Sequence, residues 1–215
     1  EDIDIPEDAY DAKRFEIERL KAAIAGDLAR LKPMHEMVQG INVEEDDKLQ
    51  TLIKRIKGEY AQSSWDAVGK EKCEGKKILI FTQFATTARY IGEELKKHFR
   101  RVEYVSGNSG GVLEKAALFS PKTESNRKYL KKRGIEVTAE NEIDILVSTE
   151  ILGEGMNLQD GQVVINYELH WNPVRIIQRV GRIDRIGSTN DKIWVYNFFP
   201  QLEADLRIGI KDVIE

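Results

Sequence analysis

A run of basic and amide side chains recurs at three- and four-residue steps in a segment with a helical pattern from about Trp171 to Ile186. Its members are Arg175, Gln178, Arg179, Arg182 and Arg185. Guanidinium groups are always charged and offer forked donors, which suits them to the oxygens of a phosphoryl group. Side chains at this spacing share a helix face, so the segment predicts an anion receptor. The same spacing also allows surface ion pairs with Asp184 and Glu168, and this alternative stays open.

A second polar segment, residues 148–159, directly follows a predicted strand. It contains Gly153 and Gly155 among hydroxyl and amide side chains. In open parallel sheets ligands bind at the carboxyl ends of the strands, where hydroxyls and glycines suit a phosphate or a sugar. A Gly-x-Gly pair alone is also typical of an ordinary turn. The segment is therefore a candidate binding loop with a simple connection as its alternative.

Several familiar catalytic motifs are absent from the sequence. It has no Gly-x-x-x-x-Gly-Lys-Ser/Thr, so it lacks the loop that cradles the phosphates of a nucleoside triphosphate. It has no Gly-x-Ser-x-Gly and no His-Glu-x-x-His, and Cys73 has no nearby histidine that would make it a nucleophile. One cysteine and three histidines give no metal-ligand spacing, which excludes structural zinc. The sequence therefore predicts no self-contained active site.

The composition of the 215 residues, with 41% hydrophobic and 33% charged, is typical of one globular domain with a small appendage. The net charge of −4 argues weakly against nucleic-acid binding, but residues 51–141 carry 19 Lys and Arg against 11 Asp and Glu. This basic middle part is where phosphate contacts would lie, although lysines on solvated helix faces need no partner, and this alternative stays open.

The sequence also bears on where the protein works. No stretch approaches the run of about 18 apolar residues that a membrane span needs, so we expect no membrane partner. A single cysteine predicts an intracellular, reducing compartment, and we expect a cytoplasmic location. Because the chain begins with acidic residues and without methionine, we interpret it as a piece of a longer polypeptide.

The first third of the chain has a helical pattern without a core of its own. Apolar residues recur at three- and four-residue steps from Glu7 to about Val38, and Pro33 is predicted to interrupt this helix. A second helix is predicted from about Asp47 to Lys57. We interpret residues 1–58 as a helical lead-in that packs on the following domain or bridges to another lobe.

From Lys77 onward, short apolar runs alternate with helical patterns. Strands are predicted at residues 78–81, 102–105, 143–147, 163–167 and 193–198, and helices at about 86–99 and 173–186. Several of these strands are apolar throughout, which is typical of a parallel sheet covered on both faces. Residues 59–215 are therefore predicted to form an α/β domain with a parallel sheet and helices on both faces.

Residues 107–142 do not fit this alternation and are interpreted as a charged insertion. A short apolar patch, residues 112–119, precedes six Lys and Arg within the twelve residues 122–133. Such a density of cations suits contact with a phosphate backbone. It is also typical of a solvated excursion, and this second interpretation is slightly favoured.

Four segments together resemble, in the same order, the motifs of superfamily-two helicases. These segments are Lys77–Phe84 (motif IV), Ile145–Gln159 (motif V), Val164–Pro173 (motif Va) and Gln178–Gly187 (motif VI). The elements Trp171-Asn172-Pro173 and Asn157-Leu158-Gln159 resemble the Swi/Snf-type branch of DNA translocases, and the end of the chain is similar to bacterial stand-alone relatives. The resemblance implies a RecA-like fold and the second of two such lobes, which closes over ATP bound by the first.

The resemblance also implies a role for each matching side chain. Arg182 and Arg185 stand at the arginine-finger positions, which reach the γ-phosphate held by the other lobe, and Gln178 stands at the nucleotide site between the lobes. The residues expected to couple the nucleotide to the nucleic acid are Gly155, Asn157 and Gln159. Those expected to hydrogen-bond nucleic-acid phosphates are Thr82, Gln83, Ser148 and Thr149. The implied cofactor is ATP with Mg²⁺, held mainly by the first lobe, so this chain alone is expected to be inactive.

The function that the resemblance implies is the second motor lobe of an ATP-dependent translocase on double-stranded DNA. Its expected partners are duplex DNA and the first RecA-like lobe of the same polypeptide. One alternative is a lobe of an unwinding helicase on DNA or RNA, because strand separators share motif VI. Another is a non-catalytic nucleic-acid-binding or interaction module that keeps the fold. Two positions depart from the family pattern: Glu150 stands where many relatives have Asp, and Ser188 where the Swi/Snf branch usually has Gln.

Overall fold

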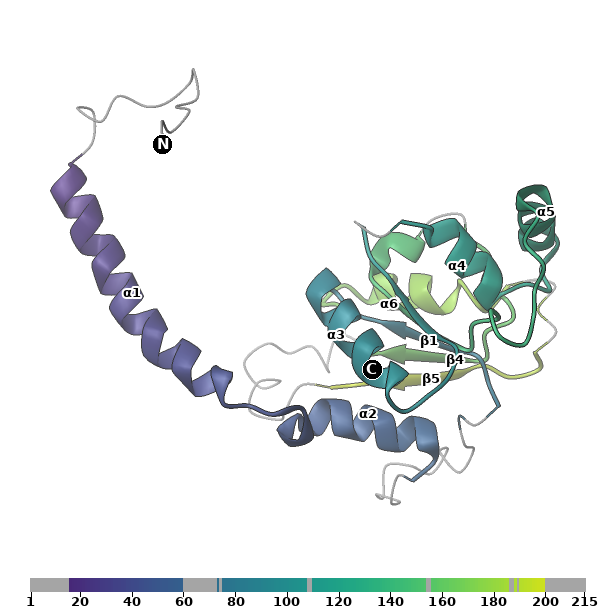
Figure 1. The fold of residues 1–215 in the computed structure, drawn as a ribbon, viewed down its shortest axis with the longest axis horizontal. Helices are drawn as coiled ribbons and strands as arrows, with labels where there is room; N and C mark the ends of the chain where they lie inside the picture. Colours follow the sequence, from purple (N-terminus) through teal and green to yellow (C-terminus); the bar gives the residue numbers. More distant parts are fainter. Residues whose placement is uncertain are drawn as a thin grey trace. The chain divides into compact units, whose positions relative to one another are not determined.

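The structure is a computed structural model that describes residues 16–59, 73, 75–107, 110–153, 156–185, 188 and 190–199. The chain divides into two compact units, Glu1–Gln50 and Thr51–Glu215, and Figure 1 shows the elements of both. Among the described residues, no helix is long and apolar enough to cross a membrane.

The main element of the first unit is α1 (Ile17–Gln39), in which no residue is buried. The prediction that Pro33 interrupts this helix is wrong, because α1 continues through Pro33 to Gln39. Proline removes one backbone hydrogen bond and crowds the preceding turn, and in a fully exposed helix water can take the place of the missing donor. The predicted helical residues 7–15 lie outside the described residues. A short 3₁₀ turn, η2 (Val43–Glu45), follows α1.

Five parallel strands form the sheet of the second unit, in the order β2-β3-β1-β4-β5 (Figure 1). They are β1 (Ile78–Phe81), β2 (Val102–Val105), β3 (Ile145–Ser148), β4 (Val163–Asn166) and β5 (Trp194–Asn197). All residues of β1, β3 and β4 are buried, as expected for apolar strands covered on both faces. The predicted α/β fold with a parallel sheet is confirmed, and each predicted strand is present to within two residues at either end.

Helices cover both faces of this sheet. They are α3 (Ala85–Lys96), α4 (Val112–Phe119), α5 (Glu124–Arg133), α6 (Pro173–Val180) and the second half of α2 (Asp47–Lys57). The strand registers place Tyr104 and Tyr196 on the same face. Tyr104 packs so closely against α3 that a Cβ added at Gly92 would lie 2.5 Å from its ring, and Arg55 of α2 lies over the Tyr196 ring at 4.6 Å. This face is therefore covered by α3 and the second half of α2.

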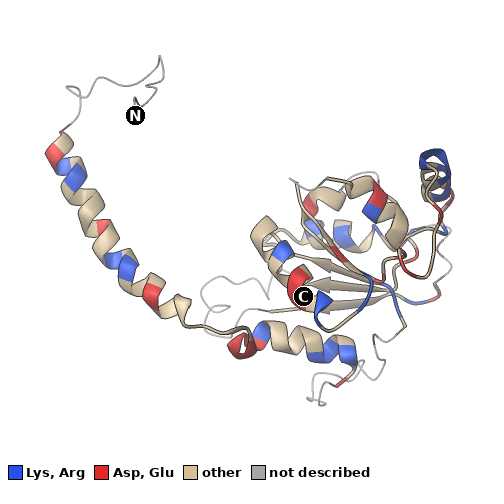
Figure 2. Cartoon of the chain, viewed as in Figure 1, with Lys and Arg blue, Asp and Glu red and all other residues tan. Residues whose placement is uncertain are grey.

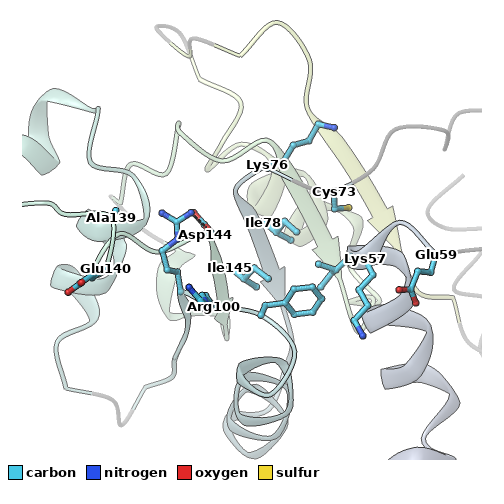
Figure 3. A pocket seen from close by; sticks show the side chains of 14 residues that line it. Lys57, Glu59, Cys73, Lys76, Ile78, Arg100, Ala139, Glu140, Asp144 and Ile145 are labelled. Atoms are coloured by element: carbon cyan, nitrogen blue, oxygen red, sulfur yellow. Dashed lines mark ion pairs between the residues drawn. The ribbon is translucent and has the colours of Figure 1, made fainter.

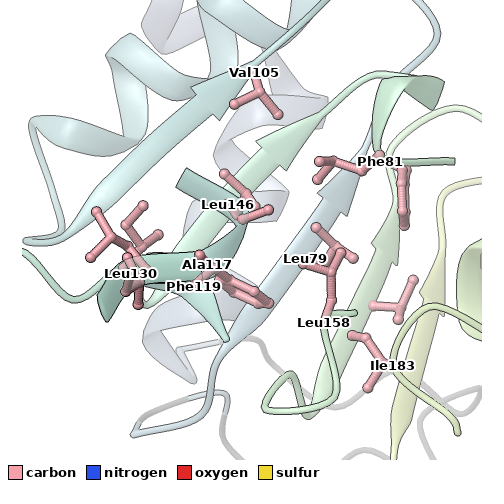
Figure 4. Packing of buried hydrophobic residues seen from close by; sticks show 14 residues of the cluster. Leu79, Phe81, Val105, Ala117, Phe119, Leu130, Leu146, Leu158 and Ile183 are labelled. Carbon is pink, nitrogen blue, oxygen red and sulfur yellow. The ribbon is translucent and has the colours of Figure 1, made fainter. Parts of the chain in front are cut away.

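The opposite face carries the main hydrophobic core, shown in Figure 4. Leu79, Phe81 and Leu146 of the sheet pack there with residues 116–119 of α4, all of which are buried. The segment 107–142 thus supplies a helix to the core of this unit. The charge of that segment is concentrated in α5, which is attached to the same core through Leu130.

Candidate functional site

The start of α6 is fixed by two residues that favour helix entry. The Asn172 side chain accepts a hydrogen bond from the backbone N–H of Val174 at 3.0 Å, which caps the first turn. Pro173 follows at the first helical position, where no backbone N–H is needed. These two residues fix the point at which the segment after β4 ends and α6 begins.

The end of α6 differs from the prediction. The helix was predicted to run to about Ile186, but it ends at Val180 with Gly181 as its cap. Glycine has a low helix propensity, and the chain continues in tight turns in which the Arg182 N–H donates to the carbonyl of Arg179. Arg182 and Arg185 therefore follow the helix and do not extend its face, although they were predicted to.

Arg179 lies at the centre of a buried polar network. Its Nε donates to Oε1 of Glu150 at 2.8 Å, and a terminal nitrogen also contacts that oxygen. The other terminal nitrogen donates to Oδ1 of Asn166 and to the backbone carbonyl of Glu168, both at 2.9 Å. The guanidinium lies over the Phe81 ring, 5.3 Å from its centroid. This buried charge is thus paired and hydrogen-bonded, as buried charges must be.

The network changes the interpretation of the arginine series. Arg179 is only 2% exposed and is neutralised by Glu150, so it is not one of the exposed anion-binding groups that were predicted. The alternative, ion pairs with Asp184 and Glu168, is also not what Arg179 forms, because Glu168 contributes only its backbone carbonyl. Glu150, the first residue of the 3₁₀ turn η3 (Glu150–Gly153), was not predicted as its partner.

Four of the five side chains of the predicted series meet around one cavity at the carboxyl edge of the sheet. The cavity has a volume of about 300 Å³, and Arg175, Gln178 and Arg182 line it together with Arg179, Glu150, Phe81 and Ile151. Arg175 and Gln178 are exposed, and no ion pair is formed by Arg175 within the described residues. Since Glu150 is already paired with Arg179, the exposed donors of Arg175 and Gln178 make this cavity suited to an anion such as a phosphate.

Arg185 does not line this cavity. Its Nε donates to the carbonyl of Gly181 at 3.1 Å, one turn earlier in the chain. The carbonyl of Arg182 accepts a hydrogen bond from the N–H of Leu158 at 3.3 Å. This second contact joins the segment after α6 to the loop that contains Asn157 and Gln159.

Asn157 and Gln159 lie next to a different cavity. They line a space of about 490 Å³ together with residues 122–125 and Asp160. The Asn157 carbonyl accepts a hydrogen bond from Nδ2 of Asn126 in α5 at 2.9 Å, and the Gln159 carbonyl accepts one from Nδ2 of Asn190 at 3.1 Å. The structure therefore does not bring these two residues into the cavity of Arg182. Gly155, predicted with them, lies outside the described residues.

The four residues predicted to contact nucleic-acid phosphates lie at the ends of two adjacent strands, β1 and β3. Thr82, Ser148 and Thr149 are buried, with exposed fractions of 9% or less, and Oγ of Ser148 donates to the Thr149 carbonyl. Gln83 is exposed, although its Nε2 donates to the Leu169 carbonyl and its N–H to Oε2 of Glu168. Of the four side chains, only that of Gln83 is exposed in this chain.

A larger cavity, of about 950 Å³, lies at the amino edge of the sheet (Figure 3). The first residues of β1 and β3, Ile78 and Ile145, line it, and so do Arg101 and Asp144, which form an ion pair. It contains none of the predicted site residues, and ligands of open parallel sheets bind at the opposite edge. We therefore place the candidate site at the α6 cavity.

Comparison with known proteins shows the family. Residues 59–187, more than half of the chain, match the family model "Helicase conserved C-terminal domain". An uncharacterized ATP-dependent helicase of Bacillus subtilis, YqhH, is 31% identical over 155 residues, which are 71% of this chain and 24% of that protein. The CHD3-type chromatin-remodeling factor CHR7 of Arabidopsis thaliana is 27% identical over 127 residues, which are 59% of this chain and 9% of that protein. The chain thus spans about a quarter or less of the length of these relatives.

One solved structure supports the fold assignment. The C-terminal part of the Fun30 ATPase domain aligns with a TM-score of 0.52 at 16% identity, over 90% of this chain and 54% of that one. At this identity the likeness shows the fold alone. The RecA-like architecture expected from the sequence is confirmed.

Proposed function

Because this chain belongs to the helicase conserved C-terminal domain family, we propose that it is the second motor lobe of an ATP-dependent translocase on double-stranded DNA. The observation that carries this proposal is the cavity in which Arg175, Gln178 and Arg182 converge at the carboxyl edge of the sheet. The sequence has no phosphate-cradling loop of its own. An anion-binding cavity without that loop is what a lobe needs if it completes a nucleotide site built mainly by another lobe.

In this proposal ATP is held by the first RecA-like lobe of the same polypeptide, together with Mg²⁺. Among the described residues, no group of three or more His, Cys, Asp or Glu could hold a metal ion. The Gln178 amide would contact the nucleotide between the lobes. Arg182 and Arg185 would act as arginine fingers, which stabilise the charge that develops on the transferred phosphoryl group. This chain alone would then not hydrolyse ATP.

The second half of the proposal concerns the nucleic acid. Gln83 is the exposed member of the group Thr82, Gln83, Ser148 and Thr149, so a direct contact with phosphate is expected first from its side chain. The three buried hydroxyl residues would reach phosphate only if the strand ends rearrange when the nucleic acid binds. Such contacts position a backbone without reading its sequence, as a translocase requires.

Coupling between the two halves would pass through the loop that contains Gly155, Asn157 and Gln159. The hydrogen bond from the Leu158 N–H to the Arg182 carbonyl is a physical link between this loop and the first finger position. A shift of the loop when the nucleic acid binds would therefore move Arg182.

Duplex DNA is preferred as the track because the elements Trp171-Asn172-Pro173 and Asn157-Leu158-Gln159 resemble the Swi/Snf-type branch. The similarity to a protein named as a chromatin-remodeling factor supports the same choice. The similarity to a protein named as an ATP-dependent helicase favours the second candidate, a lobe of an unwinding helicase on DNA or RNA. We also propose that residues 1–58 are a lead-in that packs on this lobe or bridges to the first.

The experiment that tests the finger assignment measures ATP hydrolysis and ATP binding by the polypeptide that carries both lobes. Arg182→Ala and Arg185→Ala are each expected to lower the hydrolysis rate by about 10³-fold or more, because a finger acts mainly in the transition state. ATP affinity should change little. Arg89→Ala, at an exposed arginine of α3, is the matched control and should hydrolyse ATP at the wild-type rate. Wild-type turnover in both finger variants would refute the assignment.

A further inference from the structure

The helix α5 has two faces of different chemistry. Its inner face contains Leu130, which is 3% exposed, with Asn126 and the half-buried Tyr129. Its outer face is highly charged and exposed, and Figure 2 shows the density of Lys and Arg on this helix. The residues of the outer face are Glu124, Arg127, Lys128, Lys131 and Lys132.

Contacts within the chain account for few of these charges. Lys128 forms an ion pair with Glu124 at 2.7 Å, but both side chains are 75% exposed, so the pair contributes little to stability. Arg127, Lys131 and Lys132 form no ion pair within the part of the chain that the structure describes. The outer face therefore presents three cations that the fold does not neutralise.

Helix stability explains only part of this arrangement. Lys131 and Lys132 lie in the last turn, where cations interact favourably with the helix dipole. The pairs Arg127 with Lys131, and Lys128 with Lys132, are like charges four residues apart, which destabilise a helix by about 0.2–0.5 kcal/mol each. Folding alone would thus not select four cations on this face.

The helix is also held firmly in place. Nδ2 of Asn126 donates to the carbonyls of Ser120 at 2.8 Å and Asn157 at 2.9 Å, and Leu130 is part of the main core. At the other end, Gly134 adopts the left-handed conformation with φ 69° and ends the helix with two backbone hydrogen bonds. The outer cations are therefore presented as a fixed array.

We propose that the outer face of α5 binds the phosphate backbone of the nucleic acid. This contact is separate from the strand-end residues Thr82, Gln83, Ser148 and Thr149, and from the α6 cavity, which is proposed to take the nucleotide. A helix of this length extends over about 15 Å, and duplex DNA carries one negative charge per about 1.7 Å of its axis. Over this length, a duplex carries more phosphates than the outer face has cations, so every cation could contact one. The proposal rests on the proposed function, because it names a surface through which the same lobe holds its track.

Hydrogen bonds also connect α5 with the motor site. Asn126 of α5 is hydrogen-bonded to the Asn157 carbonyl, and the next residue, Leu158, is hydrogen-bonded to the Arg182 carbonyl. A nucleic acid bound to α5 would therefore act, through these hydrogen bonds, on the loop that is joined to the first finger position.

The test compares the salt dependence of DNA binding between matched variants of the 215-residue chain. The first variant combines Arg127→Gln, Lys131→Gln and Lys132→Gln, and the control combines Lys54→Gln, Lys57→Gln and Lys192→Gln, which are also exposed. Both variants lose three positive charges, and glutamine keeps a helix propensity close to that of lysine and arginine. Binding to a fluorescent duplex and to a single strand is measured between about 50 and 200 mM salt, and circular dichroism verifies that each variant is folded.

We expect the slope of log affinity against log salt for the duplex to become shallower by about 2 to 3 in the α5 variant, at about 0.9 per lost contact, and by less than about 1 in the control. A change only with the single strand would also support the contact and would assign that strand as the track. Wild-type binding with the same slope in both variants would overturn the α5 contact and leave the proposed function intact. If the wild-type chain bound neither nucleic acid, the α5 contact and the proposed function would both be wrong.

Discussion

Arg179 and Glu150, which are 29 residues apart in the sequence, form an ion pair that joins α6 to η3 at the carboxyl edge of the sheet. The arginine side chain is 1% exposed and the glutamate side chain 33% exposed. The pair thus fixes the wall of the cavity in which Arg175, Gln178 and Arg182 converge. In the motif positions that the sequence resembles, this pair joins motif V directly to motif VI.

Removing one partner of this pair is expected to destabilise the fold strongly. Glu150→Gln leaves the buried Arg179 charge uncompensated and should lower the free energy of unfolding by about 3 kcal/mol, measured by urea denaturation. Glu136→Gln, at an exposed carboxylate, is the control and should stay within about 0.5 kcal/mol of wild type. The double variant Arg179→Met/Glu150→Leu, which removes both charges, should lose less free energy of unfolding than Glu150→Gln alone. A loss in the double variant equal to the sum of the losses in Arg179→Met and in Glu150→Leu would contradict the pair.

The contact between the motif V loop and the finger segment can be tested by filling space at Gly161. A Cβ there would lie 2.5 Å from Cδ1 of Ile183 and 3.1 Å from the Leu158 carbonyl oxygen. Gly161→Ala should therefore force apart the segments joined by the Leu158–Arg182 hydrogen bond and cost about 1–3 kcal/mol of stability. Gly107→Ala, where an added Cβ meets nothing within 4 Å, should be almost neutral. Equal melting temperatures for the two variants would contradict this account of the packing.

Burial raises the pKa of the Cys73 thiol, and the nearby charges of Arg55 and Lys76 oppose this shift only in part. Because the unfolded thiol ionises at about pH 8.5 and the folded thiol only at a higher pH, wild type should lose stability relative to Cys73→Ala as the pH rises above about 8.5. Below that pH the difference between the two proteins should be constant. Urea denaturation from pH 7 to 10 measures it, and a difference that stays flat over this range would contradict the raised pKa.

The strands were predictable because their signal is local. The run Ile78–Phe81 is apolar throughout, and a run of that kind has few places to lie other than the interior of a parallel sheet. Pro173 likewise marks the start of α6 from sequence alone.

The end of α6 and the partner of Arg179 were not predictable in this way. The three- and four-residue spacing continues through Arg182 and Arg185, so periodicity gives no sign that the helix ends at Gly181. The choice of Glu150 as partner depends on how η3 and α6 meet across the sheet, which is a property of tertiary packing. The only local signal for it was that Glu150 lies in the polar segment that follows β3.

The role of α4 was hidden for a similar reason. Its apolar patch is short and lies beside the most basic stretch of the chain, so the composition of residues 107–142 suggested a charged insertion. The burial of Ala116 and Phe119 becomes visible only when the sheet that they cover is in place.

The measurement that tests the central claim most directly is steady-state ATP hydrolysis by the polypeptide that carries both lobes, with duplex DNA, single-stranded DNA and RNA supplied in turn. If the chain is the second motor lobe of a duplex translocase, duplex DNA should strongly stimulate ATP hydrolysis, and Arg182→Ala should abolish this stimulated hydrolysis. Stimulation by single-stranded DNA or RNA alone would contradict the duplex assignment and favour the unwinding helicase. Hydrolysis that no nucleic acid stimulates would contradict the motor function itself.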